Sequence, residues 1–409
     1  MNILKSFPSE SELVQKFGAT SGDTVYKTNG HIHTPYSFSA FSSIRQAFEL
    51  ASKENIKILG INDFFVTDGY AEFYENSLKS KIFPLFNIEF IALSTDLQKQ
   101  GIRVNDPNNP GRIYISGKGL DYPAGLPEKY HMVIQSSIYE SQRQIESMIS
   151  KTNLWLEEIE AGFRLDFQEI KNNYSKNLVR ERHIAKALRV MIFQKFSQAE
   201  DRRSFLKKFY YGNEATADLE NTSSVENEIR NRILKAGGKA FVEENERAFL
   251  NLDAVTDIIH HAGGIPCYPV LLDDPKGLIT EFEKNKEALY NELTKRNIFC
   301  IELIPSRNDF KILKEFVQFF DEAGFIILFG TEHNTPDLTP LTVSCRNQVA
   351  LDSDMVRIGF EGACLIAAHQ YLRAKGIKSK VSQWLSLNDN EKARLKILGR
   401  SVVEQFLKS

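Results

Sequence analysis

The chain has 409 residues and a formal net charge of −2, and 42% of its residues are hydrophobic and 25% charged. These are ordinary globular values, so we expect one large α/β domain with insertions, or two domains. Basic residues are mixed with acidic ones, which argues against binding to long nucleic acid. No apolar run has the length of a signal peptide or a membrane span, so we expect a cytoplasmic protein that does not bind membranes; the sequence leaves its oligomeric state open.

The first part of the chain predicts alternating helices and strands. Residues 43–54 carry apolar side chains at helical spacing, and residues 57–63 and 82–91 are short apolar runs that also carry acidic residues. This order is typical of a parallel β/α domain, in which functional side chains lie at the C-terminal ends of the strands.

The middle of the chain has a different pattern. Residues 94–129 are polar and rich in Gly and Pro, which predicts a loop excursion from the core, and regular structure resumes at residues 130–134. Residues 138–238 combine long charged and apolar segments at helical spacing. We interpret them as a helical subdomain, inserted or appended.

The β/α pattern then returns and ends in a helical segment. The predicted elements are a helix at 252–259, strands at 265–270, 298–304 and 325–330, a helix at 310–323, and helices within 360–408 with a break near Gly376. The expected organisation is therefore a core in two parts, 1–137 and 239–345, a helical insertion at 138–238, and a C-terminal segment at 346–409.

The candidate site begins with a His-x-His pair. On a strand, His31 and His33 point to the same side and present two nitrogen ligands to one space. Such a pair can arise by chance, and an acid at a strand end is often only a loop cap. However, eight acids and imidazoles lie at predicted strand ends, which favours a shared metal centre: His31, His33, Asp63, Glu89, His131, Glu302, Glu332 and His333.

Taken in order, these segments resemble the PHP family, the polymerase and histidinol phosphatase domain, and most closely its small-nucleotide phosphoesterase subgroup. The matching segments are 31–34 for the His-x-His motif, 60–63 for Thr-Asp-His, 87–89 for Gly-x-Glu, His131, the helical stretch 182–188, and 238–242 with 262–269 for the Ala-His-Pro region. The resemblance implies a distorted (β/α)7 PHP-type barrel, formed by 1–137 and 239–345, with a large helical insertion and a helical C-terminus.

The resemblance also implies which metal positions remain. One ion would be held by His31, His33, Glu89 and Glu332, where Glu332 replaces the family's Asp. A second ion would use His131, together with Tyr268 as a phenolate or His333 from one residue away, and is left open. A third should be absent, because the family's ligands are replaced by Phe38, Phe64 and Asn334. We therefore expect one divalent ion, Zn, Mn or Fe, and leave a second ion open.

The implied function is a metal-dependent hydrolase, specifically a phosphoesterase that cleaves a small phosphorylated metabolite or nucleotide with metal-activated water. Asp63 or His333 would orient the water or protonate the leaving oxygen, and Arg182 or Arg307 would bind the phosphate of this small anionic substrate. The alternatives are another metal-assisted activity, such as an isomerase, a lyase or a non-phosphate hydrolase, and a non-catalytic protein that binds a metal or metabolite. The complete first ligand set favours retained metal chemistry.

Overall fold

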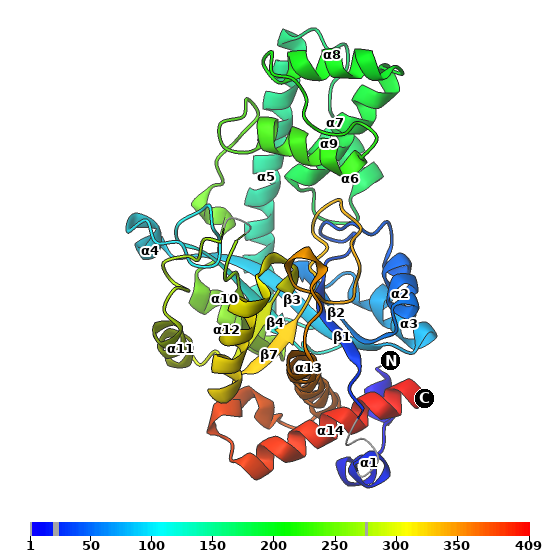
Figure 1. The fold of residues 1–409 in the computed structure, drawn as a ribbon, viewed down its shortest axis with the longest axis vertical. Coiled ribbons are helices and arrows are strands. Elements are labelled where there is room, and N and C mark those ends of the chain that lie inside the picture. The colour runs from blue at the N-terminus through cyan, green and yellow to red at the C-terminus, as the bar shows by residue number, and fades with distance from the viewer. Residues whose placement is uncertain (1, 19–23, 275–276) are drawn as a thin grey trace.

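The computed structural model describes residues 2–18, 24–274 and 277–409, and its core is one seven-stranded sheet curved into a nearly closed barrel (Figure 1). The strands follow one another around the sheet in chain order: β1 (Lys27–Ile32), β2 (Ile56–Phe64), β3 (Phe83–Leu93), β4 (Arg112–Lys118), β5 (Ile265–Val270), β6 (Cys300–Leu303) and β7 (Ile326–Phe329). Neighbouring strands are parallel, except that β4 runs antiparallel to both β3 and β5. The predicted fold class, a distorted seven-stranded α/β barrel, is confirmed.

The barrel closes between the end of β1 and the segment after β7. The His33 amide donates to the carbonyl oxygen of Glu332 at 2.7 Å, and the Glu332 amide donates to the His31 carbonyl oxygen at 2.9 Å. This exchange lies at the C-terminal ends of the parallel strands. We call this end of the barrel the mouth.

The alternation of side chains along β3 shows how the interior is layered. Phe83 and Leu85 pack with the C-terminal helices, whereas Ile88 and Phe90 belong to the apolar cluster that includes the outer helices. Glu89 follows Phe83 and Leu85 at even spacing and therefore lies on their side of the sheet, nearer the mouth. The interior is thus apolar where the strands begin and polar near the mouth.

The helices around the barrel largely match the sequence pattern. They are α2 (Ile44–Lys53), α3 (Tyr70–Ser80), α10 (Leu252–His261), α11 (Lys286–Lys295) and α12 (Phe310–Glu322), with the short helices α1 (Glu10–Phe17) and α4 (Thr95–Lys99) outside this set. In α2 the predicted apolar stripe is buried, and the Ser43 hydroxyl caps the helix by accepting from the Gln46 amide. Helices of this kind cover the outer face of the sheet (Figure 1).

The C-terminal helices α13 (Ser353–Ala374) and α14 (Asp389–Lys408) cover the end of the barrel opposite the mouth (Figure 1). They pack closely, because a side chain at Gly399 would place its Cβ 1.9 Å from the carbonyl oxygen of Cys364. Within the described part of the chain, no helix is long and apolar enough to cross a membrane.

The helical segment has its own apolar core beside the barrel. It contains α5 (Glu128–Glu158), α6 (Phe167–Tyr174), α7 (Glu181–Lys195), α8 (Ala199–Phe209) and α9 (Thr222–Ile229). Figure 1 shows α5 extending from the barrel to the other four helices. The side chain of Gln142 on α5 bonds both the amide and the carbonyl of Val179, at 3.1 and 3.0 Å, which fixes the strand-like segment before α7 against α5.

Two boundaries differ from the sequence prediction. Residues 94–129 are not only an excursion, because they contain β4, a strand in the middle of the sheet. Residues 130–134 lie in the first turns of α5, so the predicted boundary between 137 and 138 falls inside this helix. The first difference arises because β4 directs Ser116 and Lys118 into the site and therefore lacks the apolar run of a buried strand.

Candidate metal centre

Two imidazoles and one carboxylate converge inside the barrel near the mouth. His31 and His33 come from the end of β1 and the residue after it, and their Nε2 atoms lie 3.2 Å apart. Oε2 of Glu89, from β3, lies 3.2 Å from Nε2 of His33 and 3.9 Å from Nε2 of His31. All three side chains are at most 2% exposed. The structure therefore brings together three of the four residues predicted for the first ion.

Glu302 holds His31 from behind. His31 Nδ1 lies 3.0 Å from Oε2 of Glu302, which also accepts from the Lys118 ammonium at 2.5 Å. The Ser116 hydroxyl donates to the other carboxylate oxygen of Glu302 at 2.5 Å. The Nδ1–H of His31 therefore donates to Glu302, and the Nε2 lone pair is directed toward Glu89, His33 and the Asn62 amide nitrogen, which lies 3.1 Å from it.

Asp63 supports His33 in the same way, through a hydroxyl. Nδ1 of His33 lies 3.4 Å from Oγ of Ser37, and this hydroxyl donates to Asp63 at 2.6 Å. The amide and the hydroxyl of Thr34 also donate to Asp63, at 2.7 and 2.5 Å. Asp63 therefore positions His33 through Ser37, and the role predicted for it toward the attacking water stays a prediction.

Burial sets the protonation of the cluster. It lowers the pKa of His33 below the ordinary value, so this imidazole is neutral and its Nε2 atom can bind a metal. Burial also raises the pKa of Glu89 to about 8, although the nearby His31 acts in the opposite direction. For Glu302 burial is outweighed by Lys118 and His31, which hold the pKa of this carboxyl well below its usual range.

The donor set fits a divalent metal ion. Oε2 of Glu89 is buried and has no hydrogen-bond donor among the residues that the structure describes. Leaving a buried carboxylate oxygen without a partner is unfavourable, and a cation between this oxygen and the two Nε2 atoms would supply that partner. His31, His33 and Glu89 form one buried group whose donor atoms lie within 4.8 Å of one another. Two imidazoles and a carboxylate suit Zn, Mn or Fe.

Glu332 lies at the same mouth but has a different partner. Its carboxylate forms an ion pair with the guanidinium of Arg307. Burial opposes ionisation, yet Arg307, His31 and His33 together lower the pKa of Glu332. The roles predicted for Glu332 as a ligand and for Arg307 as a phosphate contact remain predictions, and both require this ion pair to open.

The other predicted residues are directed elsewhere. His131 is exposed on α5 rather than at a strand end. Tyr268 is buried on β5, and its hydroxyl donates to Glu283 at 2.9 Å; burial raises the pKa of this phenol well above 10, which disfavours a phenolate ligand. Both nitrogens of His333 have partners, Thr331 at 2.8 Å and the carbonyl of Thr339 at 2.9 Å. The structure therefore does not bring His131, Tyr268 or His333 into the buried group of His31, His33 and Glu89, and the roles predicted for them stay predictions.

Two phenyl rings occupy the region where the family resemblance places ligands of a third ion. The Phe64 ring stacks on His33 at 4.6 Å, and the guanidinium of Arg180 lies 5.1 Å from the centre of the same ring. The Arg182 guanidinium lies 5.6 Å from the centre of the Phe38 ring. Two cations from the helical segment therefore lie over the rings that replace ligands.

Sequence reasoning missed Arg180, which has no motif around it. Within the described ranges, no acceptor bonds its guanidinium, whereas Arg182 donates to Asn227 at 3.2 Å. Burial lowers the pKa of Arg182 to about 10, so this side chain stays charged at neutral pH. Sequence reasoning also missed Lys118 and Ser116, because a strand with inward polar residues resembles a loop, and it gave no role to Asn62 on β2.

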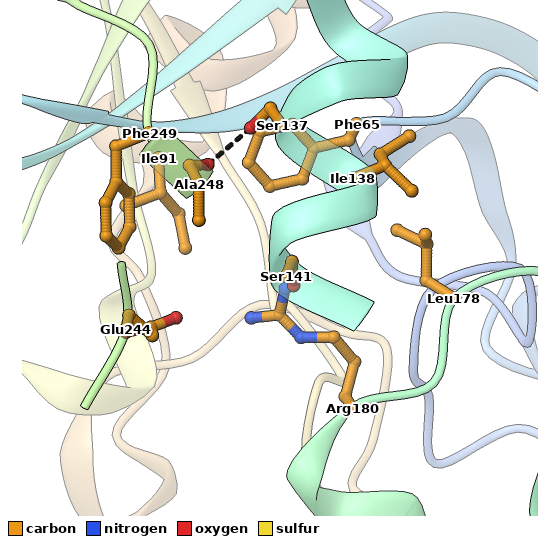
Figure 2. A pocket seen from close by; sticks show the side chains of 10 residues that line it. All are labelled: Phe65, Ile91, Ser137, Ile138, Ser141, Leu178, Arg180, Glu244, Ala248 and Phe249. Carbon is orange, nitrogen blue, oxygen red and sulfur yellow. Dashed lines mark hydrogen bonds between the residues drawn. The ribbon is translucent and has the colours of Figure 1, made fainter. Parts of the chain in front are cut away.

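A small cavity separates α5 from the barrel beside Arg180 (Figure 2). It encloses about 10 Å³, which is room for about one water molecule. In Figure 2 Arg180 reaches toward α5, and Phe65, which follows Phe64, lines the same cavity. A larger cavity of about 300 Å³ includes Tyr122 and Arg373 and is lined by none of the cluster residues.

The chain is similar to one protein family in sequence and to solved structures in fold. Residues 29–226 match the family model of the PHP domain. A proposed metal-dependent phosphoesterase from Bifidobacterium adolescentis is similar in structure, with a TM-score of 0.51 and 16% identity over 81% of this chain and 94% of that chain. An amidohydrolase from Chromobacterium violaceum with bound sulfate has a TM-score of 0.49 and 16% identity over 78% of this chain and 93% of that chain. No curated protein shows significant sequence similarity.

Proposed function

We propose that this chain, in which residues 29–226 form a PHP domain, is a metal-dependent hydrolase, a phosphoesterase that acts on a small phosphorylated metabolite or nucleotide. The observation that carries the proposal is the buried group of His31, His33 and Glu89, whose free carboxylate oxygen faces two nitrogen lone pairs. A divalent ion held there supplies a Lewis acid and lowers the pKa of its bound water.

The chain's own residues prepare this chemistry. Glu302 and Asp63 fix the two imidazoles with Nε2 directed inward, so little reorganisation is needed when the ion binds. Burial of the three ligands excludes bulk water and strengthens every charge interaction in the site.

Arg180 and Arg182 support the choice of a phosphate substrate. In the family a third ion helps hold the phosphate, and here two guanidiniums lie on the rings that replace its ligands. Guanidinium groups bind phosphate oxygens through paired hydrogen bonds. Arg180 has a further advantage, since among the described residues it has no acceptor to give up when a substrate binds.

Arg180→Met should raise KM for a phosphorylated substrate about tenfold or more while the metal content stays unchanged, because a charge-assisted hydrogen bond contributes about 1.5–3 kcal/mol. Steady-state kinetics with metal analysis would test this. Arg203→Met is the matched control, because Arg203 is exposed on α8, and its KM should not change. Equal KM values for both variants would contradict the role of Arg180.

Metal affinity should increase with pH up to about pH 8. The pKa of Glu89 in the metal-free protein is raised to about 8, so below that pH the ion must displace a proton. The apparent affinity should rise by up to about tenfold per pH unit between pH 6 and 8 and then level off. The same raised pKa makes the free energy of unfolding of the metal-free protein depend on pH. The contribution of protonated Glu89 is fully present below about pH 4.5 and is lost as pH rises through 8. Calorimetric titration with Mn²⁺ across this range is the measurement; a constant affinity would contradict the assignment.

The function itself is tested by phosphate release. Purified protein with Mn²⁺ or Zn²⁺ would be assayed on nucleoside bisphosphates, phosphate monoesters and sugar acids. We expect release of inorganic phosphate from at least one phosphorylated compound and none after removal of the metal. Turnover of the sugar acids alone, with metal bound, would replace the phosphoesterase by another metal-assisted activity.

A further inference from the structure

Lys118 is a fully buried lysine inside the barrel. Its side chain is 0% exposed, and its ammonium donates to Oε2 of Glu302 at 2.5 Å and to the Asn62 amide oxygen at 3.2 Å. A buried ion pair of this kind is often no more stable than an apolar pair of the same volume, so stability alone is a weak reason for its presence. Its position next to the metal ligands suggests another role.

The contacts of Lys118 extend to His31 through two side chains. Glu302 receives the Lys118 ammonium and the His31 Nδ1–H on the same oxygen, Oε2. The Asn62 amide nitrogen lies 3.1 Å from His31 Nε2 and 3.1 Å from the Ser116 hydroxyl. Lys118 thus fixes both groups that surround this imidazole, although it is not itself a ligand.

The charges at the site also limit its metal content. The carboxylates of Asp63, Glu89, Glu302 and Glu332 lie within the site, and the side chains of Lys118 and Arg307 each pair with one of them. Asp63 accepts three hydrogen bonds, so of these four carboxylates Glu89 is the one with a buried oxygen that lacks a partner among the described residues, and Arg180 adds a further cation over Phe64. One divalent ion satisfies that open position. A second divalent ion would leave an excess of positive charge in a low-dielectric interior, which is costly.

We propose that Lys118 pairs with Glu302 inside the barrel and holds it beside Nδ1 of His31, so that Glu302 orients this ligand instead of binding a second ion and the centre takes one divalent cation. The inference rests on the proposed function, because it assumes that His31, His33 and Glu89 bind a metal. Lys118 is therefore a positioning residue whose removal should change the metal stoichiometry.

The test is Mn²⁺ binding to the full chain after removal of metal with a chelator, followed by calorimetric titration and elemental analysis. The wild type should bind one Mn²⁺ per chain. Lys118→Met leaves Glu302 without its cation, so this variant should bind two. Glu302→Gln should bind one Mn²⁺ with about 10- to 100-fold weaker affinity, because His31 loses its support. The double variant should behave like Glu302→Gln and bind no second ion.

Arg189→Met is the matched control. Arg189 pairs with the largely buried Glu226 at 2.8 Å in the helical segment, so the substitution breaks a comparable ion pair away from the barrel. This variant should keep one Mn²⁺ with unchanged affinity.

Two ions in the wild type, or a single ion in Lys118→Met, would overturn the inference. If Lys118→Met does not fold, the wild-type stoichiometry and the affinity of Glu302→Gln still decide the matter. A wild-type protein that holds one ion but releases no phosphate would contradict the proposed function and not this inference. A protein that binds no ion would overturn both.

Discussion

Glu89→Gln and His31→Ala should each abolish stoichiometric metal binding and lower kcat/KM by about 10³-fold or more. Each change removes one of three converging donors, and Glu89→Gln also removes the charge that attracts the ion. Lewis-acid stabilisation by a bound metal contributes several kcal/mol, and each 1.36 kcal/mol corresponds to tenfold in rate. The measurements are elemental analysis of the purified variants and steady-state kinetics with excess Mn²⁺.

His131→Ala is the control for these variants. It removes an imidazole that the sequence also placed among the ligands, but the structure leaves this side chain exposed on α5. Its metal content and activity should therefore equal those of the wild type. If His131→Ala lost metal as His31→Ala does, the assignment of the centre to His31, His33 and Glu89 would be wrong.

Gly330→Ala should weaken both the fold and the metal site. A Cβ at Gly330 would lie 2.3 Å from Cβ of His31 and 3.0 Å from its backbone nitrogen, where ordinary contacts begin at 3.4 Å. The end of β7 must then move away from β1 by about 1 Å, which displaces His31 from its position among the ligands. We expect about 10- to 100-fold weaker Mn²⁺ binding, because a metal ligand loses its support, and a loss of about 3 kcal/mol in the free energy of unfolding.

Substitutions at two further glycines distinguish a loss of folding stability from a loss of metal affinity. Gly399→Ala creates a clash between α13 and α14 and should lower stability without changing Mn²⁺ affinity in the folded protein. Gly125→Ala introduces a methyl group with no atom within 4 Å and should change neither. Denaturant unfolding and calorimetry on the same samples would measure both quantities. Unchanged Mn²⁺ affinity in Gly330→Ala would show that His31 tolerates movement of β7.

The sequence predicted most of the barrel because its strands are covered on both sides. β3 is a largely apolar run, and β1, β2, β5 and β6 are each followed by a helix with a buried apolar face, α2, α3, α11 and α12. β4 was missed for a physical reason. Its sequence alternates Ile113 and Ile115 with Tyr114, Ser116 and Lys118, and Ser116 and Lys118 face the polar interior, so the pattern resembles an exposed segment.

Of the candidate site, sequence reasoning predicted the residues of the first ion. His31, His33 and Glu89 could be found because their residue types indicate metal binding and each lies at or near the end of a predicted strand. His333 and Tyr268 could not be judged from sequence, since their roles depend on which partners their polar atoms meet. Arg180 was not identified because its importance comes from contact with Phe64, which is 116 positions away in the sequence.

The reversed direction of β4 determines where α5 begins on the barrel. β4 ends at Lys118 beside Ile265, where the parallel strands begin, so α5 must start near the closed end and climb the side of the barrel. Gln142, which anchors the segment before Arg180, lies about 21 Å along this helix at about 1.5 Å per residue. The length of α5 therefore sets the position of this segment. One helical turn more or less would shift the guanidiniums of Arg180 and Arg182 by about 5.4 Å relative to the metal ligands. The proposed phosphate contact of Arg180 therefore depends on the length of α5 between Glu128 and Gln142.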